Sequence, residues 1–141
     1  MLRRWRLAIL SALCGVLIAA AKVNDGSSWG AVILLLAFLG LAVALSPGVF
    51  PRPERAADAL RDGRPVVYWR PGCPFCLRLR ARLGPEAARL HWVDIWQDPE
   101  GAAAVRAITG GDETVPTVVI AGEGFVNPDP SWLRDRIAAV S

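Results

Sequence analysis

The chain has 141 residues, of which 53% are hydrophobic, and it carries a net charge of +3. Its mean hydropathy of +0.34 is high for a purely soluble protein. The charge is modest and no basic stripe alternates with aromatic residues, so we expect no nucleic-acid binding. Three cysteines are too few for a scaffold held together by disulfides.

The excess of apolar residues lies near the N-terminus and predicts a transmembrane hairpin over residues 1–50. Two apolar runs, at 5–21 and 29–45, are each about 17 residues long, which is the short end for a helix that spans a membrane. The first has one charge, Arg6, near its start. Two alternatives remain open. The first run resembles a cleaved signal peptide. Both runs could also be core helices of a soluble protein, although apolar residues on all faces favour lipid over a protein core.

Basic residues flank the two runs unequally. The chain carries Arg3, Arg4 and Arg6 at the start of the first run and Arg52, Arg55, Arg61 and Arg64 after the second. The connection between the runs has only Lys22, with Asp25 close by. By the positive-inside rule we expect a two-span membrane protein with both termini in the cytoplasm.

The remainder predicts one small globular domain over residues 65–141, joined to the hairpin by a linker at 51–64 that contains a short helix at 54–61. The hydrophobic pattern predicts strands at 65–69, 90–95, 117–120 and 125–126 and helices at 74–83, 99–108 and 131–140. This β-α-β-α-β-β-α order predicts an α/β domain, with a four-stranded mixed sheet covered by helices.

Two cysteines, Cys73 and Cys76, lie where the first strand of this domain leads into its first helix. Unpaired backbone N–H groups and the helix dipole favour a thiolate at the first position. Pro74 suits the first helical turn, and Cys76, one turn deeper, is expected to be buried and neutral. A thiolate with a second thiol one turn away is typical of thiol–disulfide oxidoreductases.

Positive charge near the cysteines strengthens this prediction. Arg70 precedes the pair, and Arg78, Arg80 and Arg82 follow it on the helix. We expect this charge to lower the pKa of Cys73 below the free-thiol value of about 8.5.

A structural zinc pair or a structural disulfide are the alternatives for Cys73 and Cys76. Zinc takes four ligands, and the chain offers only Cys14, inside the first apolar run, and His91, inside a predicted strand. We therefore expect no metal. We interpret Cys14 as a small apolar residue and His91 as an ordinary strand residue.

The segment Thr114-Val115-Pro116-Thr117 is the second candidate element. A proline at the start of a strand cannot donate to the sheet, and a cis peptide bond before Pro116 would account for its presence. If this loop packs beside the cysteines, the backbone of Val115 can pair with an extended substrate.

Taken together, these segments resemble a glutaredoxin, in particular the mycoredoxin-like branch of actinobacteria. The resemblance rests on Cys73-Pro-Phe-Cys76, Val93-Asp94-Ile95, the stretch 110–117 and Asn127-Pro128. It implies a thioredoxin fold and reduction of mixed disulfides between proteins and a low-molecular-weight thiol. The membrane hairpin is not part of the family pattern.

The resemblance also implies roles for individual residues. Cys73 would be the attacking cysteine and Cys76 the resolving one. The loop residues Thr114, Val115 and Pro116 would contact the substrate backbone. We add Arg70 and Phe75 as substrate-binding candidates.

One departure from the family concerns the small thiol. Glutaredoxins that use glutathione place Gly-Gly and an acidic pair where this chain has Val126-Asn127-Pro128-Asp129-Pro130. Mycoredoxins have a similar Asn-Pro and use mycothiol, so we expect mycothiol rather than glutathione as the reductant, with no bound cofactor.

The predicted partners are thiolated or disulfide-bonded proteins, the small thiol and membrane lipid, and we expect a monomer. Three alternative functions remain open: an extracytoplasmic protein-disulfide reductase or oxidase, a module that binds an iron–sulfur cluster, and a redox-sensing anchor without catalytic activity.

Overall fold

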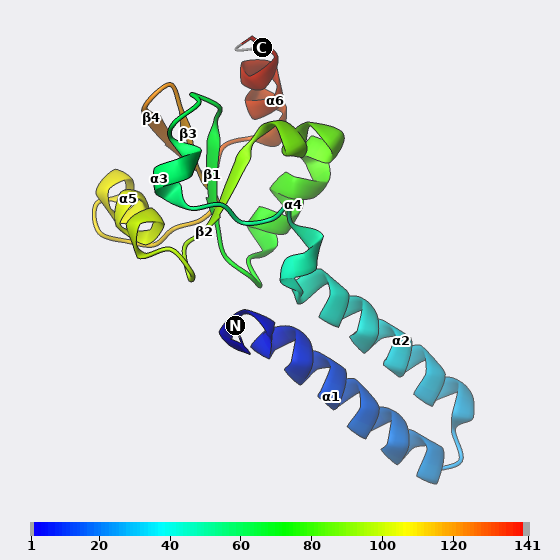
Figure 1. The fold of residues 1–141 in the computed structure, drawn as a ribbon. Helices are drawn as coiled ribbons and strands as arrows, with labels where there is room; N and C mark the ends of the chain where they lie inside the picture. The colour runs from blue at the N-terminus through cyan, green and yellow to red at the C-terminus, as the bar shows by residue number, and fades with distance from the viewer. Residues whose placement is uncertain (1, 140–141) are drawn as a thin grey trace. The chain divides into compact units, whose positions relative to one another are not determined.

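The structure, a computed structural model, describes residues 2–139 (Figure 1). The chain divides into two compact units, and the division lies between Val49 and Phe50. The first unit is a helical hairpin of α1 (Leu2–Asn24) and α2 (Ser28–Leu45), followed by a short 3-10 helix, η1 (Pro47–Val49). Its stretches Trp5–Asn24 and Ser28–Leu45 are long and apolar enough to cross a membrane. The two helices expected at 5–21 and 29–45 are therefore present, each slightly longer than its apolar run.

Small residues let the two helices of the hairpin approach closely. Ala8, Ser11 and Ala19 are buried on one side of α1. A Cβ atom added at Gly15 would lie 2.5 Å from Cβ of Phe38 on α2. Because small side chains allow such backbone approach in membranes, this contact fits a hairpin in lipid.

The second unit is an α/β domain. Its elements are α3 (Ala56–Ala59), β1 (Val66–Trp69), α4 (Pro74–Leu83), η2 (Gly84–Arg89), β2 (His91–Asp94), α5 (Pro99–Thr109), β3 (Thr117–Ile120), β4 (Glu123–Val126) and α6 (Pro130–Ala139). The sheet order is β2-β1-β3-β4, with β1 parallel to β2 and antiparallel to β3. This mixed four-stranded sheet confirms the predicted thioredoxin fold.

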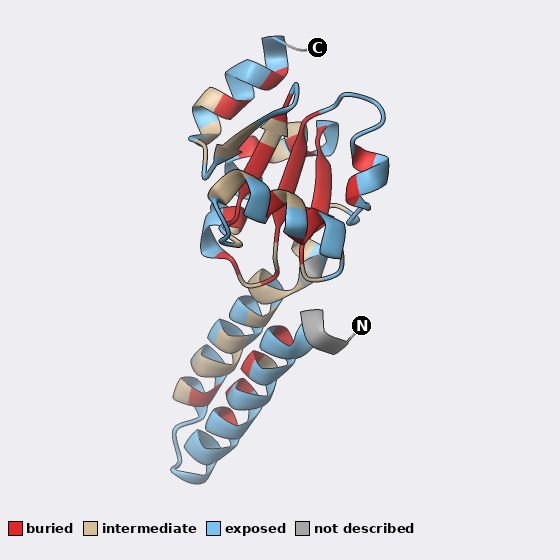
Figure 2. Cartoon of the chain, turned by 90° about the vertical axis from the view of Figure 1, so that its left-hand side faces the viewer, coloured by how far each residue is buried: buried red, intermediate tan, exposed pale blue. Residues whose placement is uncertain are grey.

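The core lies on both faces of β1, whose four residues are all buried (Figure 2). Helices α3 and α5 lie on one side of the sheet and α4 and α6 on the other (Figure 1). On the α5 side, a Cβ atom added at Gly101 would lie 2.7 Å from Cγ1 of Val93. The absence of a side chain at Gly101 therefore lets α5 pack directly on β1 and β2.

The segment expected to be a linker, 51–64, differs from the prediction because it packs on the sheet as part of the second unit. Phe50 stacks on Trp69 with ring centroids 3.9 Å apart. The Glu54 N–H donates to the Trp92 carbonyl at 2.8 Å, which covers the outer edge of β2. The helix expected at 54–61 is only the four residues of α3, because these contacts hold the preceding chain in an extended form.

Other bounds follow the prediction closely. The helix α4 begins and ends as expected, whereas the residues after it form the 3-10 helix η2 rather than a simple stop. The strand β4 begins at Glu123, two residues before the predicted start. The last residue of the helix predicted at 131–140 lies outside the described residues.

Candidate active site

Cys73 is the N-cap residue of α4. Its backbone is extended, with φ −83° and ψ 112°, and Pro74 fills the first helical position. The Cys76 N–H donates to Sγ of Cys73 at 3.2 Å. A sulfur that caps a helix in this way replaces the side-chain oxygen of a Ser or Asp cap, and its negative form is stabilised by the unpaired N–H groups.

Several contacts lower the pKa of Cys73 to about 6. The largest contribution is a hydrogen bond from the Cys76 thiol, and the backbone N–H groups of Cys76 and Phe75 and the charge of Arg70 act in the same direction. Burial opposes them, since Cys73 is only 5% exposed. The net result is a thiol that is mostly ionised at neutral pH.

Cys76 shows the opposite behaviour. Its side chain is fully buried. The hydrogen bond to Cys73, burial and the nearby Cys73 charge all raise its pKa, so it stays protonated. Both cysteines are free thiols in the structure. The two residues therefore have the electrostatic asymmetry that an attacking and a resolving thiol need.

Only one of the four predicted arginines contributes to this asymmetry. Arg70 lowers the pKa of Cys73, as expected. Arg80 instead donates to the Gly84 carbonyl at 2.9 Å, at the far end of α4. In contrast to the expectation, Arg78, Arg80 and Arg82, which lie five or more positions after Cys73, are not among the causes of its lowered pKa.

The loop before β3 lies directly against Cys73. The peptide bond between Val115 and Pro116 is cis, which confirms the prediction. In its protonated form, Cys73 donates through Sγ to the Val115 carbonyl at 3.4 Å. The Asn127 N–H donates to the Pro116 carbonyl at 2.7 Å and holds the loop against the end of β4. The structure thus brings together Val115, Pro116 and Cys73, which lie about 40 positions apart in the chain.

The remaining candidates lie around this centre. Thr114 is exposed, and its carbonyl accepts from Oγ1 of Thr117 at 2.8 Å. Phe75 is 55% exposed, and it lines a groove of about 200 Å³ together with Leu79 and the stretch 127–130. The sequence linked the stretch 126–130 to the choice of small thiol but predicted no site residue in it. The Asp-Pro-Ser sequence at 129–131, a typical helix start, was the available signal.

Asp129 occupies the N-terminus of α6 at this groove. Its carboxylate accepts from the N–H groups of Ser131, at 2.8 Å, and Trp132, at 3.2 Å. The Ser131 hydroxyl, those N–H groups and the charge of Arg78 lower the pKa of Asp129. The N-terminus of α6 is therefore already capped by a carboxylate of the chain itself, that of Asp129.

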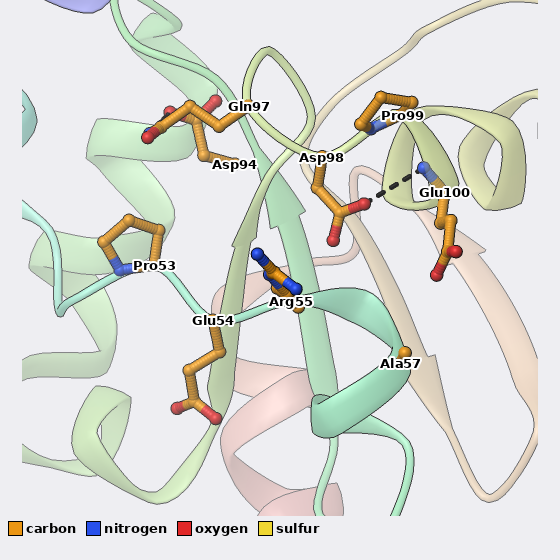
Figure 3. Close-up of a pocket in the computed structure, with 9 residues that line it drawn as sticks. All are labelled: Pro53, Glu54, Arg55, Ala57, Asp94, Gln97, Asp98, Pro99 and Glu100. Atoms are coloured by element: carbon orange, nitrogen blue, oxygen red, sulfur yellow. Dashed lines mark hydrogen bonds between the residues drawn. The ribbon is translucent and has the colours of Figure 1, made fainter. Parts of the chain in front are cut away.

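A second hollow, of about 650 Å³, lies between the α3 segment and the β2–α5 connection (Figure 3). Two of its carboxylates, Asp94 and Asp98, already have structural partners. Asp98 accepts from the Glu100 N–H at 3.0 Å and caps α5, and Asp94 accepts from the Trp96 N–H at 3.0 Å. Among the residues that the structure describes, none lines both this hollow and the groove at Phe75.

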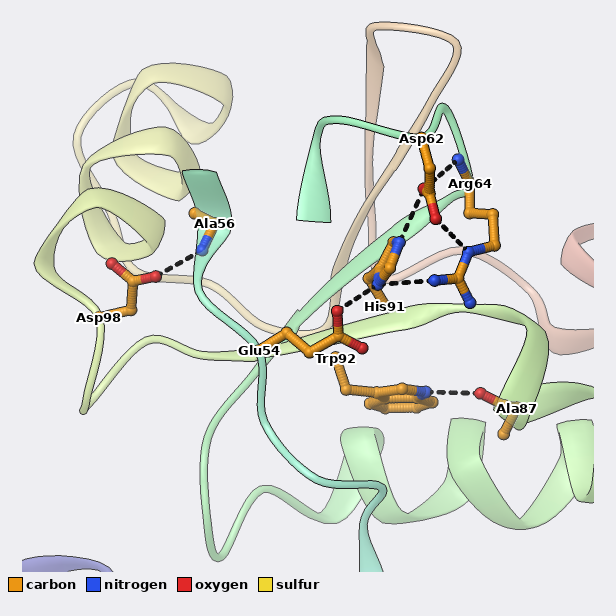
Figure 4. Close-up of polar contacts among 8 residues, drawn as sticks. All are labelled: Glu54, Ala56, Asp62, Arg64, Ala87, His91, Trp92 and Asp98. Carbon is orange, nitrogen blue, oxygen red and sulfur yellow. Dashed lines mark hydrogen bonds and ion pairs between the residues drawn. The ribbon is translucent and has the colours of Figure 1, made fainter. Parts of the chain in front are cut away.

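His91 has a larger role than the sequence predicted. The ring is buried, with Nδ1 2.6 Å from Glu54 and Nε2 2.8 Å from Asp62 (Figure 4). Hydrogen bonds from His91 and then Arg64 lower the pKa of Asp62. His91 is thus a residue of strand β2, as expected, and its ring also connects the segment before β1 to the sheet. Among residues 2–139, no group of three or more His, Cys, Asp or Glu side chains is arranged to hold a metal ion.

Comparison with known proteins agrees with this site. The glutaredoxin family profile matches residues 66–126, which include both cysteines and Pro116. Two curated proteins of Mycobacterium tuberculosis are 30% identical to the chain over 77 residues, which is 54% of this chain and 92% of each relative. They are "Putative glutaredoxin MT3292" of strain CDC 1551 / Oshkosh and "Putative glutaredoxin Rv3198A" of strain ATCC 25618 / H37Rv. The chain therefore belongs to the glutaredoxin family and is a thiol–disulfide oxidoreductase.

Proposed function

We propose that this chain is a membrane-anchored glutaredoxin that reduces mixed disulfides between proteins and a low-molecular-weight thiol, with its catalytic domain in the cytoplasm. The observation that carries the proposal is the position of Cys73. Its sulfur caps α4, has a pKa of about 6 and contacts the Val115 carbonyl.

The chemistry follows from the two cysteines. The Cys73 thiolate attacks the small-thiol sulfur of the mixed disulfide, the old S–S bond breaks, and the protein leaves as a thiolate that takes up a proton. The small thiol is now joined to Cys73. A second small thiol attacks the small-thiol sulfur of this new disulfide, forms a small-thiol disulfide and releases Cys73 as a thiolate. Alternatively, Cys76 attacks the sulfur of Cys73, which releases the small thiol and leaves a Cys73–Cys76 disulfide that further thiol must reduce. When a free small thiol resolves the adduct, the mixed disulfide and that thiol are converted into one reduced protein cysteine and one disulfide between two small thiols.

The loop at Val115 would hold the substrate during this exchange. A substrate backbone that pairs with Val115 in strand fashion would place its disulfide over Sγ of Cys73. Thr114 and Pro116 flank this contact. Arg70 would act through its charge on the thiolate, and Phe75 would provide an apolar surface beside it.

The groove favours mycothiol over glutathione as the small thiol. Glutathione-using relatives bind a glycine carboxylate at a helix N-terminus, and here Asp129 holds the N-terminus of α6. In place of the Gly-Gly of those relatives, the chain carries Asn127-Pro128 beside this N-terminus. Mycothiol carries no carboxylate, and this agrees with the mycoredoxin-like Asn127-Pro128 segment.

The two apolar helices support membrane anchoring, and the arginines around them support a cytoplasmic catalytic domain. Such an anchor would confine the enzyme to thiol adducts near the membrane and raise its effective concentration there.

The direct test is reduction of a mycothiolated and a glutathionylated protein by the full chain in detergent micelles, with each thiol as reductant. We expect faster turnover with mycothiol and none after Cys73→Ser. Retained activity in Cys73→Ser would contradict the assigned nucleophile. Labelling of Cys73 in intact cells by a membrane-impermeant maleimide would contradict the cytoplasmic orientation and favour an extracytoplasmic reductase or oxidase.

A further inference from the structure

The segment at residues 50–55, which we call the β2 strap, takes no part in the chemistry at Cys73. It covers the outer edge of β2, where the Glu54 N–H donates to the Trp92 carbonyl at 2.8 Å. Phe50, at its start, stacks on Trp69, the last residue of β1. Because the first unit ends at Val49, the β2 strap is the part of the domain to which the helical hairpin is joined.

A buried histidine fastens the β2 strap to the sheet. The His91 ring is 3% exposed and lies between two carboxylates, with Nδ1 2.6 Å from Oε2 of Glu54 and Nε2 2.8 Å from Oδ1 of Asp62 (Figure 4). Arg64 is the third charged neighbour of the ring, and its Nη2 lies 3.5 Å from Nδ1. Each ring nitrogen therefore has a carboxylate oxygen at hydrogen-bond distance.

This arrangement needs a proton on both ring nitrogens. An ionised carboxylate only accepts, so a nitrogen that pairs with one must donate, and a neutral imidazole has only one N–H. With both carboxylates ionised, the two contacts are therefore complete only when His91 is an imidazolium ion. The lowered pKa of Asp62, to which the hydrogen bond from His91 contributes most, agrees with a ring that donates to it.

Loss of one proton from the ring acts mainly on the contact with Glu54. The Nε2–H can still donate to Asp62, whose carboxylate also accepts from the backbone N–H of Arg64 at 3.1 Å and from its Nε at 2.6 Å. Nδ1 then becomes an acceptor, which suits the guanidinium of Arg64 but not the carboxylate of Glu54. The Glu54 side chain is 43% exposed and can turn to solvent. The contact that opens is thus the one that holds the β2 strap.

The start of α3 is held by a contact that does not involve this proton. The Ala56 N–H donates to Oδ2 of Asp98 at 2.6 Å (Figure 4). Opening is therefore confined to the β2 strap. When the strap is open, the connection between α2 and the packed part of the domain extends from residues 46–49 to residues 46–55.

From this geometry we propose that His91 is a pH-sensitive catch for the β2 strap, whose charged form holds the strap on β2 and whose neutral form lets go of Glu54. Because the ring gains two acidic partners in the docked form, docking is complete on the acidic side of the titration of His91 and weakens as the pH rises through it. Opening takes Phe50 off Trp69, four positions before Cys73, and lengthens the connection to the hairpin. The catch goes beyond the proposed function, since it controls how the catalytic domain is held rather than the reaction at Cys73.

Hydrogen–deuterium exchange of the full chain in micelles measures this opening. The observable is the protection factor of residues 50–55, which is corrected for the intrinsic exchange rate at each pH, from about pH 5 to about pH 9. We expect it to fall about 10-fold, the lower end for a hydrogen bond between charged groups, because Glu54 is 43% exposed. The ring is followed by ¹⁵N NMR, since His91 is the one histidine in the sequence. The midpoints of the two curves should coincide.

Three variants separate the catch from a general effect of pH. In Glu54→Gln the amide can accept from the charged ring and donate to the neutral one, so the protection factor should change by less than about 3-fold. His91→Gln has no titrating ring and should be equally flat. Asp58→Asn is the matched control, because Asp58 pairs with Arg61 at 3.5 Å rather than with His91, and this variant should keep the full fall.

Three results would overturn the catch. They are a protection factor in the parent that does not change with pH, an equal fall in either glutamine variant, and a ring that is already neutral at the pH where the β2 strap is protected. None of these measurements uses turnover, so their outcome is independent of whether the chain reduces mixed disulfides.

Discussion

The ionisation of Cys73 gives the sharpest prediction. With a pKa of about 6, the thiol is about 90% ionised at pH 7, against about 3% for a free thiol of pKa 8.5. The largest cause of the shift is the hydrogen bond from the Cys76 thiol. A hydrogen bond to a charged group contributes about 1.5–3 kcal/mol, so its removal in Cys76→Ala should raise the pKa by about 1–2 pH units.

The assay is the rate of iodoacetamide alkylation as a function of pH, in a Cys14→Ala background that removes the third thiol. The parent should show a midpoint near pH 6. Cys76→Ser is the matched control, because its hydroxyl still donates to Cys73 and should hold the midpoint close to that of the parent. A parent midpoint near 8.5, or equal midpoints in Cys76→Ala and Cys76→Ser, would refute the reasoning.

Three further predictions concern stability, measured as the free energy of unfolding of the full chain in micelles. Because the folded pKa of Cys73 is depressed, its ionisation stabilises the fold above pH 6 and not below. The pH-dependent difference from Cys73→Ser should grow to about 1.4 kcal/mol at pH 7, and a flat difference would contradict the depressed pKa. Gly101→Ala should destabilise the domain by about 1–3 kcal/mol, since its Cβ would meet Val93; a stabilised variant would show that α5 can shift. Phe50→Ala should cost about 3–5 kcal/mol by removing the ring stacked on Trp69; a loss below about 1 kcal/mol would mean that the segment that begins at Phe50 is not part of the domain core.

Local signals account for what the sequence could predict. The helix α4 begins at Pro74 and ends before Gly84-Pro85, and each of these residues acts on the backbone beside it. The cis bond before Pro116 was predictable because a proline has no N–H for the sheet and is rare at the start of a strand unless a tight turn precedes it. The predicted order of strands and helices also held, since each element carries its own hydrophobic period.

Tertiary contacts account for what the sequence could not predict. The partners of His91 lie 29 and 37 positions away, and no local pattern joins them. The helix expected at 54–61 begins only at Ala56, because Glu54 pairs with the edge of β2. Likewise, the positive potential expected from Arg80 was lost because its side chain caps the far end of α4.

The measurement that most directly tests the central claim is intact-protein mass spectrometry of the Cys76→Ser chain after reaction with a mycothiolated protein. Without Cys76 the first intermediate cannot be resolved internally. The account predicts one mycothiol joined to Cys73 and the substrate protein released as a free thiol. A disulfide between Cys73 and the substrate protein, or a chain that remains unmodified, would contradict it.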